Sequence, residues 1–304
     1  MADRNPWDLI IIGAGMAGLS TAIWARRLGL SALVLEREQQ PGGQLTAIRG
    51  RIVDYPGLDL PEGAALTERI LRQAREAGAE LRPDWEAQAV DAAGLTCEAT
   101  NGQVTGRAMV IATGLTARRL GVDGEEELYR HRLVRRPSHD MAWFRSKRVV
   151  VIGGGDRAVE NALMLAATAS QVTLLHRGPQ LRARAPLAAP LRAHPQVELR
   201  LNTSVTRFAV ADGRARIAAR SGSTPVELEA DAVCIYIGNR PNSGLVQGQV
   251  ELDSEGYIVT DRYGRTSVPH LYAVGDVCTP PSFQSLATAA GQAMVAAKQI
   301  ALEL

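Results

Sequence analysis

One unit, an apolar run followed by a glycine-rich turn, occurs twice in this chain of 304 residues and limits its fold more than any other feature. In the first copy, the run DLIII at residues 8–12, apolar after its first residue, leads into GAGMAG at 13–18, and a second apolar run follows at 32–35. The second copy keeps this order at residues 148–152, 153–158 and 171–175. Continuous apolar runs predict buried parallel strands, and the Ala- and Leu-rich stretches after both turns predict helices. The repeat therefore predicts an α/β protein with two Rossmann-like dinucleotide-binding domains.

The glycines of each turn have separate mechanical roles. The first permits a tight strand-to-helix turn, the second lets the backbone approach a pyrophosphate, and the third position packs helix against strand. In the first copy these positions are Gly13, Gly15 and Gly18; in the second copy they are Gly153, Gly155 and Ala158. We expect a pyrophosphate on the positive end of each following helix.

The two copies differ at the end of their second strand, where an adenosine ribose is bound. Glu36 and His176 each lie 23 positions after the first glycine of their turn. A carboxylate accepts hydrogen bonds from ribose hydroxyls, which suits FAD or NAD. The pair His176-Arg177 is cationic and suits the 2′-phosphate of NADP, and Arg182 lies within reach on the following loop.

Composition excludes several other classes of protein. The balance of 34 basic and 32 acidic residues gives no reason to expect nucleic acid, and the uncharged run at residues 9–25 contains the first glycine turn and is no membrane span. The three cysteines, Cys97, Cys234 and Cys278, are far apart, which excludes a local zinc site, a Cys-x-x-Cys pair and a disulfide scaffold. We expect a cytoplasmic protein without a signal peptide or a metal.

Further motifs give the chain a family resemblance. In order they are PGGQL (41–45), DYPG (54–57), IATG (111–114), IGNRPN (237–242), YAVGD (272–276) and AGQA (290–293). The set resembles the low-molecular-weight thioredoxin reductase-like flavoproteins, class II of the pyridine nucleotide-disulfide oxidoreductases. The resemblance implies a homodimer and two three-layer ββα domains. An FAD-binding domain at residues 1–117 plus 243–304 would surround an inserted NAD(P)-binding-like domain at residues 118–242.

The resemblance also implies roles for particular residues. Gly13, Gly15 and Gly18 would hold the FAD pyrophosphate and Glu36 the ribose. The flavin itself would be lined by Gly43, Gln44, Thr113, Gly114, Gly275 and Asp276, with Gln284 and Ser285 where the family usually has Arg and Gln near the pyrimidine edge. In the inserted domain the implied nucleotide residues are Gly153, Gly155, Arg157, His176, Arg177 and Arg182.

The chain departs from the family at the redox-active dithiol. The family's Cys-x-x-Cys-Asp motif falls on residues 136–140, where only Asp140 matches. Thiol–disulfide exchange needs both sulfurs, so direct reduction of thioredoxin by the usual relay is not expected. His139 could stand over the flavin as an acid, donor or stacking group, with Asp140 assisting proton transfer; the alternative is that His139 is a surface or hinge residue. Cys97 and Cys234 are expected to be small buried hydrophobes.

Three functions follow from this departure. The first is an FAD-dependent oxidoreductase that passes electrons from NAD(P)H to an unidentified acceptor. The second is a flavoprotein independent of pyridine nucleotides, which uses ferredoxin or carries a second FAD in the NADP-like domain. Residues 118–148, with nine basic and five acidic side chains, could dock an acidic carrier such as ferredoxin or flavodoxin, hold the phosphates of a second dinucleotide, or form an ordinary solvated face. The third is a non-catalytic flavin-binding protein.

Overall fold

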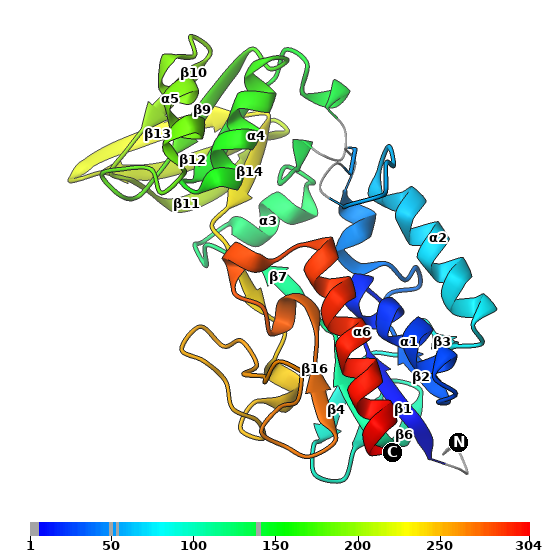
Figure 1. Ribbon diagram of the computed structural model, residues 1–304. Coiled ribbons are helices and arrows are strands. Elements are labelled where there is room, and N and C mark those ends of the chain that lie inside the picture. Colours follow the sequence, from blue (N-terminus) through cyan, green and yellow to red (C-terminus); the bar gives the residue numbers. More distant parts are fainter. Residues whose placement is uncertain (1–5, 49–50, 53–54, 138–140) are drawn as a thin grey trace. The chain divides into compact units, whose positions relative to one another are not determined.

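The computed structural model describes residues 6–48, 51–52, 55–137 and 141–304, and the chain divides into two compact units (Figure 1). Unit 1 is formed by Met1–Thr116 and Arg240–Leu304, and unit 2 is formed by Ala117–Asn239 between them. The predicted boundaries, after residues 117 and 242, lie close to these. Two short strands at the crossings, β7 (Leu115–Ala117) and β15 (Asn239–Pro241), pair with each other.

A seven-stranded sheet forms the centre of unit 1. The strand order is β3-β2-β1-β6-β5-β4, and β16 also pairs with β6. The strands are β1 (Trp7–Ile12), β2 (Ala32–Leu35), β3 (Glu80–Arg82), β4 (Ala87–Asp91), β5 (Thr96–Ala99), β6 (Gly102–Ile111) and β16 (Leu271–Ala273). The long strand β6 pairs antiparallel with β5 at its start and parallel with β1 and β16 at its end. It therefore belongs to both the parallel sheet and an antiparallel β layer.

Alternate residues of β1 lie in different hydrophobic cores, which shows how the layers of unit 1 are built. Leu9 and Ile11 pack in the same core as residues of α1 (Met16–Arg27), α2 (Gly63–Glu76) and α6 (Leu286–Glu303). Ile10 and Ile12 pack in a second core with β4, β5 and residues 245–278. Because side chains alternate across a strand, these two cores lie on opposite faces of the sheet.

Unit 2 repeats this design with a smaller sheet. Its four parallel strands, in the order β10-β9-β8-β14, are β8 (Arg148–Gly153), β9 (Gln171–Leu175), β10 (Val197–Arg200) and β14 (Ala232–Tyr236). A separate antiparallel sheet contains β11 (Thr203–Ala211), β12 (Arg214–Ser221) and β13 (Thr224–Ala230). The helices are α3 (Glu125–Arg130), α4 (Asp156–Ala166) and α5 (Ala185–Ala193).

The cores of unit 2 again separate the two faces of the parallel sheet. Val149 and Val151 of β8 pack with residues of α4 and α5, whereas Val150 and Ile152 pack with Phe208 and other residues of the antiparallel sheet and α3. Both units are thus helix, parallel sheet and antiparallel β layer, and the second is inserted in the first. This confirms the predicted fold class of two three-layer ββα domains.

Candidate dinucleotide sites

The first glycine turn, between β1 and α1, has the close packing that a pyrophosphate-binding turn requires. Gly13 has a φ of +105°, and a Cβ there would lie 2.5 Å from the carbonyl oxygen of Ala112. A Cβ on Gly18 would lie 1.9 Å from the carbonyl oxygen of Gly13. A Cβ on Gly15 would meet nothing within 4 Å. The outer two glycines are therefore needed for packing, while Gly15 faces open space at the start of α1, where an anion can approach the backbone.

Glu36 follows β2 and reaches the glycine turn. Its side chain is buried, and its two oxygens accept hydrogen bonds from the backbone N–H of Ala14 at 2.8 Å and of Glu38 at 3.0 Å. The predicted ribose acceptor therefore lies beside the turn. Its carboxylate is held in place by two backbone donors, and each oxygen retains a lone pair for a further donor.

Four of the predicted flavin residues lie together although they are far apart in the sequence. Gln44 Nε2 donates a hydrogen bond to Asp276 Oδ2 at 3.1 Å. A Cβ on Gly43 would lie 3.2 Å from the Cα of Gly15, and a Cβ on Gly114 would lie 3.7 Å from Gln44 Nε2. The short 3-10 helix η1 (Gly43–Ala47) thus brings its first residues against the first glycine turn and the segment after β6. This arrangement fits an elongated polar ligand that starts at Gly15 and passes Gln44 and Asp276.

Two side chains that sequence reasoning did not assign hold these segments in place. Asn242 Nδ2 donates to the carbonyl oxygen of Thr113 at 2.9 Å, while Thr113 Oγ1 donates to the carbonyl oxygen of Asn242 at 2.8 Å. Gln292 Oε1 accepts from the backbone N–H of Gly275 at 2.8 Å. Both residues belong to the motifs 237–242 and 290–293, so their presence in those motifs was the available signal.

Gln284 and Ser285 serve locally at the start of α6. Gln284 Nε2 donates to the carbonyl oxygen of Thr279 at 2.9 Å, and Ser285 Oγ accepts from the backbone N–H of Thr288 at 3.0 Å. Ser285 is therefore the N-cap of the helix. These contacts give both residues a structural role, and their predicted place near the flavin edge stays a prediction.

The second glycine turn, between β8 and α4, is packed in the same way. A Cβ on Gly153 would lie 2.3 Å from the carbonyl oxygen of Tyr236, and one on Gly155 would meet nothing within 4 Å. A Cβ on Gly154 would lie 2.2 Å from His176 Nδ1, and one on Gly178 would lie 3.0 Å from His176 Nε2. The imidazole of His176 therefore lies between two glycine backbones, beside the turn.

The environment of His176 bears on its predicted role. Burial lowers the pKa of the imidazole below 6.5, and the charges of Arg182 and Arg177 lower it further. The lowered pKa favours the neutral ring, and the predicted binding of a 2′-phosphate by His176 stays a prediction. The positive charge at this strand end comes from Arg177 and Arg182.

Arg184 is a further residue at this turn that the sequence did not indicate. Its Nε atom donates to Asp156 Oδ2 at 2.6 Å, and its backbone N–H donates to Asp156 Oδ1 at 2.8 Å. These bonds lower the pKa of Asp156, the backbone bond having the largest effect. The loop after β9 is thereby tied to the first residue of α4, next to Gly155.

None of the three cysteines forms a pair. Cys97 and Cys234 are fully buried, in unit 1 and unit 2 respectively, and burial raises the pKa of each thiol to about 12. Both are small buried hydrophobes, as predicted. The Cys278 thiol donates to the carbonyl oxygen of Gly275 at 3.3 Å, and burial raises its pKa to about 11. The predicted catalytic residues His139 and Asp140 lie outside the described residues.

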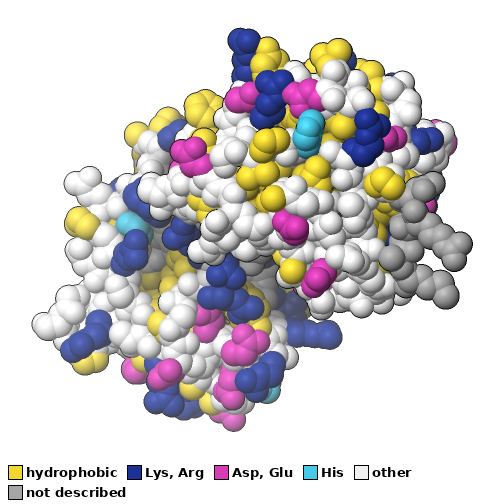
Figure 2. Space-filling view, turned by 90° about the horizontal axis from the view of Figure 1, so that it is seen from below, with side chains coloured by type: hydrophobic (Ala, Val, Ile, Leu, Met, Phe, Trp, Pro, Cys, Tyr) yellow, Lys and Arg dark blue, Asp and Glu magenta, His cyan; other side chains and the backbone are white. Residues whose placement is uncertain are grey.

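The basic segment at residues 118–148 carries internal pairing. Arg119 lies 3.7 Å from Glu126 and stacks over the ring of Tyr129 at 3.4 Å, and Arg148 lies 3.3 Å from Glu229. On the face of the molecule in Figure 2, Lys and Arg groups are interspersed with Asp and Glu groups.

Among the described residues, no cluster of His, Cys, Asp or Glu could hold a metal ion. None of the helices described combines the length and the apolar character of a membrane span.

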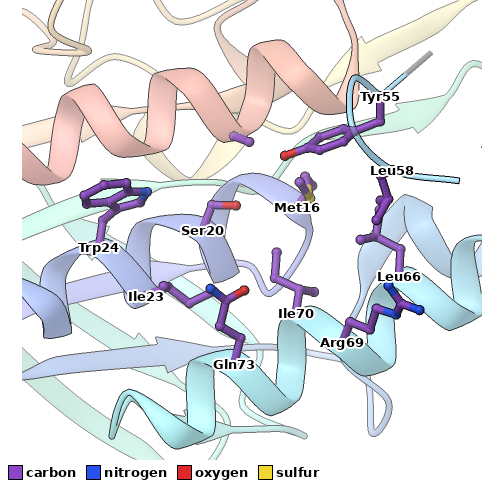
Figure 3. Close-up of a pocket in the computed structure, with 11 residues that line it drawn as sticks. Met16, Ser20, Ile23, Trp24, Tyr55, Leu58, Leu66, Arg69, Ile70 and Gln73 are labelled. Carbon is purple, nitrogen blue, oxygen red and sulfur yellow. The ribbon is translucent and has the colours of Figure 1, made fainter. Parts of the chain in front are cut away.

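A groove of about 320 Å³ lies in unit 1 between α1, α2 and residues 55–58 (Figure 3). Its lining is mostly apolar, with Arg69 and Gln73 among its polar members. Met16, one residue after Gly15, lines it, but Gly15, Gly43, Gln44 and Asp276 do not. The groove is therefore distinct from the assembled dinucleotide site.

The family model for pyridine nucleotide-disulphide oxidoreductases matches residues 7–299, and the chain belongs to this family. A thioredoxin reductase of Listeria monocytogenes is 35% identical over 295 residues, covering 95% of this chain and 91% of that protein. The crystal structure of Lactococcus lactis thioredoxin reductase has a TM-score of 0.84 at 29% identity and covers 98% of this chain and 100% of that one. That of T. acidophilum thioredoxin reductase has a TM-score of 0.81 at 30% identity, with 99% of both chains covered.

Family membership and geometry agree on the cofactor. The family supports FAD, with NADPH as a possible second nucleotide. The open space at Gly15 and the grouping of Gly43, Gln44 and Asp276 fit FAD in unit 1. The open space at Gly155, with Arg177 and Arg182 beside His176, fits a second dinucleotide in unit 2.

Proposed function

We propose that the chain is an FAD-dependent oxidoreductase of thioredoxin reductase type that passes electrons from NAD(P)H to an acceptor without a dithiol of its own. The observation that carries this proposal is the grouping of Gln44 and Asp276, 232 residues apart, beside the glycine turn of unit 1. Residues so distant in sequence have no local reason to meet, and they line the space that starts at Gly15.

In unit 1 the FAD pyrophosphate would lie on the backbone at Gly15, with Glu36 accepting from the ribose and Asp276 from the ribityl hydroxyls. In unit 2 the nicotinamide nucleotide would lie at Gly155, with Arg177 and Arg182 at its 2′-phosphate. FAD, when bound, supplies a group that accepts a hydride and passes electrons on. The protein's residues orient the two nucleotides and set the charge around them.

The acceptor is proposed to be other than a disulfide reduced by thiol exchange. A thiolate is the nucleophile of that chemistry, and two sulfurs must lie side by side. Cys97 and Cys234 are buried in different units with raised pKa values, and Cys278 has no second cysteine near it in sequence. His139 and Asp140 stay the candidates for a proton-transfer role at the flavin.

One experiment tests the proposal. FAD per chain is counted on the purified protein, and flavin bleaching is followed anaerobically with NADPH, NADH and reduced ferredoxin as separate donors. One FAD per chain and rapid bleaching by NADPH support the proposal. Two FAD per chain, or bleaching by ferredoxin alone, contradict it and favour the flavoprotein that is independent of pyridine nucleotides. An absence of bleaching with every donor favours a non-catalytic flavin-binding protein.

One observation favours the flavoprotein that is independent of pyridine nucleotides. The pair Asp156–Arg184 ties the loop after β9 to the start of α4, and Arg157 places a long cation at the same turn. An acidic carrier such as ferredoxin or flavodoxin would be attracted by Arg157 and its basic neighbours. A second FAD would instead place its pyrophosphate there.

We also propose a homodimer, with the groove of unit 1 as the surface that a second copy covers. The groove is lined by aliphatic and aromatic side chains, among them Trp24, Tyr55 and Leu58 (Figure 3). Apolar surface of this kind is typical of the centre of an interface between identical chains. The mass of the protein in solution, measured by light scattering, tests the dimer.

A further inference from the structure

A tyrosine lies at the second glycine turn, in unit 2. Tyr236 is the last residue of β14 and is paired in register with Gly153, the first glycine of the turn. Its side chain is half-buried. In open parallel sheets, ligands bind at the carboxyl ends of the strands, so the phenol of Tyr236 lies where a ligand of this domain is expected.

Two arginines from different segments are brought to the same end of the sheet. The backbone N–H of Arg135 donates to the carbonyl oxygen of Val233 at 3.0 Å, and Val134 forms a parallel bridge with Val233. Arg136 is therefore carried alongside the last residues of β14. Arg157 is the second residue of α4, at the other side of the turn. Burial raises the pKa of the Tyr236 phenol, and the charges of Arg136 and Arg157 oppose that rise.

Within the described residues, the side chains of Arg136 and Arg157 form no hydrogen bond, ion pair or cation–π contact, and both are exposed. Arg119, Arg148 and Arg184 of the same unit all have acidic partners. Two like charges held at the same end of a sheet repel each other unless an anion lies between them.

A second pair of arginines lies on the other side of the same turn. The charges of Arg177 and Arg182 both lower the pKa of the buried His176 at the end of β9. In the strand order β10-β9-β8-β14, the strands β9 and β14 flank β8, which leads into the glycine turn. The two arginine pairs are therefore separate positive centres on either side of that turn.

We propose that Arg136 and Tyr236, together with Arg157, bind the diphosphate of a dinucleotide in unit 2, separately from the 2′-phosphate site of Arg177 and Arg182. The Tyr236 hydroxyl and the guanidinium N–H groups donate, and the diphosphate oxygens accept. Arg136 thus has a binding role at one of the positions where a cysteine was expected. This inference rests on the proposed nucleotide site of unit 2.

Ligands that carry the diphosphate, the 2′-phosphate or both separate the two centres. The affinity of the FAD-loaded protein for ADP, 2′-AMP, NADH and NADPH is measured by calorimetry for the wild type and for Arg136→Gln, Tyr236→Phe and Arg182→Gln. Loss of a charge-assisted hydrogen bond at Arg136 is expected to weaken ADP, NADH and NADPH alike by about tenfold and to leave 2′-AMP unchanged. Arg182→Gln is expected to weaken 2′-AMP and NADPH only.

The control is Arg220→Gln, which removes an exposed arginine of β12 in the same unit. It should leave all four affinities unchanged, and melting temperatures show that each variant is folded. Equal ADP affinity in Arg136→Gln and the wild type overturns this inference while the proposed function stands. No binding of any of the four ligands by the wild type overturns the pyridine-nucleotide function itself. If the wild type binds two FAD per chain and Arg136→Gln binds one, the diphosphate site is supported with a flavin as its ligand.

Discussion

The substitution Gly15→Ala separates ligand binding from folding in unit 1. Gly15 is the N-cap of α1 with φ −79° and ψ −169°, a conformation that alanine adopts without strain. A Cβ there meets no atom of the protein within 4 Å. The apoprotein should therefore lose only the N-cap preference of glycine over alanine, less than about 1 kcal/mol. The added methyl group instead occupies the space through which a pyrophosphate would approach the helix amides.

The cost to FAD binding is much larger than the cost to folding. Displacing the pyrophosphate from the backbone removes at least one hydrogen bond to a charged group, about 1.5–3 kcal/mol. This corresponds to about 10- to 150-fold weaker binding. The assay is titration of apoprotein with FAD, followed by flavin fluorescence, together with thermal unfolding of the same apoprotein.

Two matched glycines provide the controls. Gly291→Ala lies on the exposed side of α6, where a Cβ meets nothing, and should raise apoprotein stability by about 0.5–1 kcal/mol without changing FAD affinity. Gly18→Ala would place its Cβ 1.9 Å from the carbonyl oxygen of Gly13 and should destabilise the apoprotein itself. Wild-type FAD affinity in a stable Gly15→Ala variant would refute the assignment of this turn to FAD.

Three shorter predictions follow. Cys278→Ser should leave flavin bleaching by NADPH unchanged, because its thiol, with a pKa of about 11, is protonated at neutral pH; a lost or much slower bleaching phase in stopped flow would give it a redox role. The backbone N–H of Ser31 and the side chain of Arg107 hold the pKa of Asp8 below 3.8, so its stabilisation is present above that pH and lost as the pH falls through the lowered value. Urea unfolding from pH 5 to 2 should therefore show a flatter pH profile for Asp8→Asn. Trp24→Glu in the groove should give a monomer by light scattering, whereas Met164→Glu, exposed in unit 2, should not; a dimeric Trp24→Glu would remove the groove from the interface.

Local sequence predicted the repeating elements well. The predicted strands at residues 8–12 and 148–152, each apolar after its first residue, lie in β1 and β8, and both glycine turns lead into helices. These features depend on neighbouring residues, because a buried parallel strand needs a continuous apolar run and a tight turn needs glycine. The arrangement of each parallel sheet between a helical layer and an antiparallel β layer was predicted from the family resemblance. No local pattern in the sequence indicates which strands lie outside the parallel sheet.

The pKa of His176 depends on features that a local sequence pattern does not contain. The position of the residue was predicted from its spacing, and it does lie at the second glycine turn. Its pKa is lowered by burial between Gly154 and Gly178 and by the nearby charges of Arg177 and Arg182. Burial is a property of the packed domain, so no local pattern could have predicted the lowered pKa.

By itself, the sequence determined two dinucleotide-type domains, the glycines of their turns and the scarcity of cysteines. The tertiary structure decided which distant segments meet: Gln44 with Asp276, and Asn242 with Thr113. The physical reason is that strand order and loop closure, rather than local conformational preference, bring such residues together. The repeat can therefore be read directly along the chain, whereas the polar groups that would surround each nucleotide can be seen only after the sheets have formed.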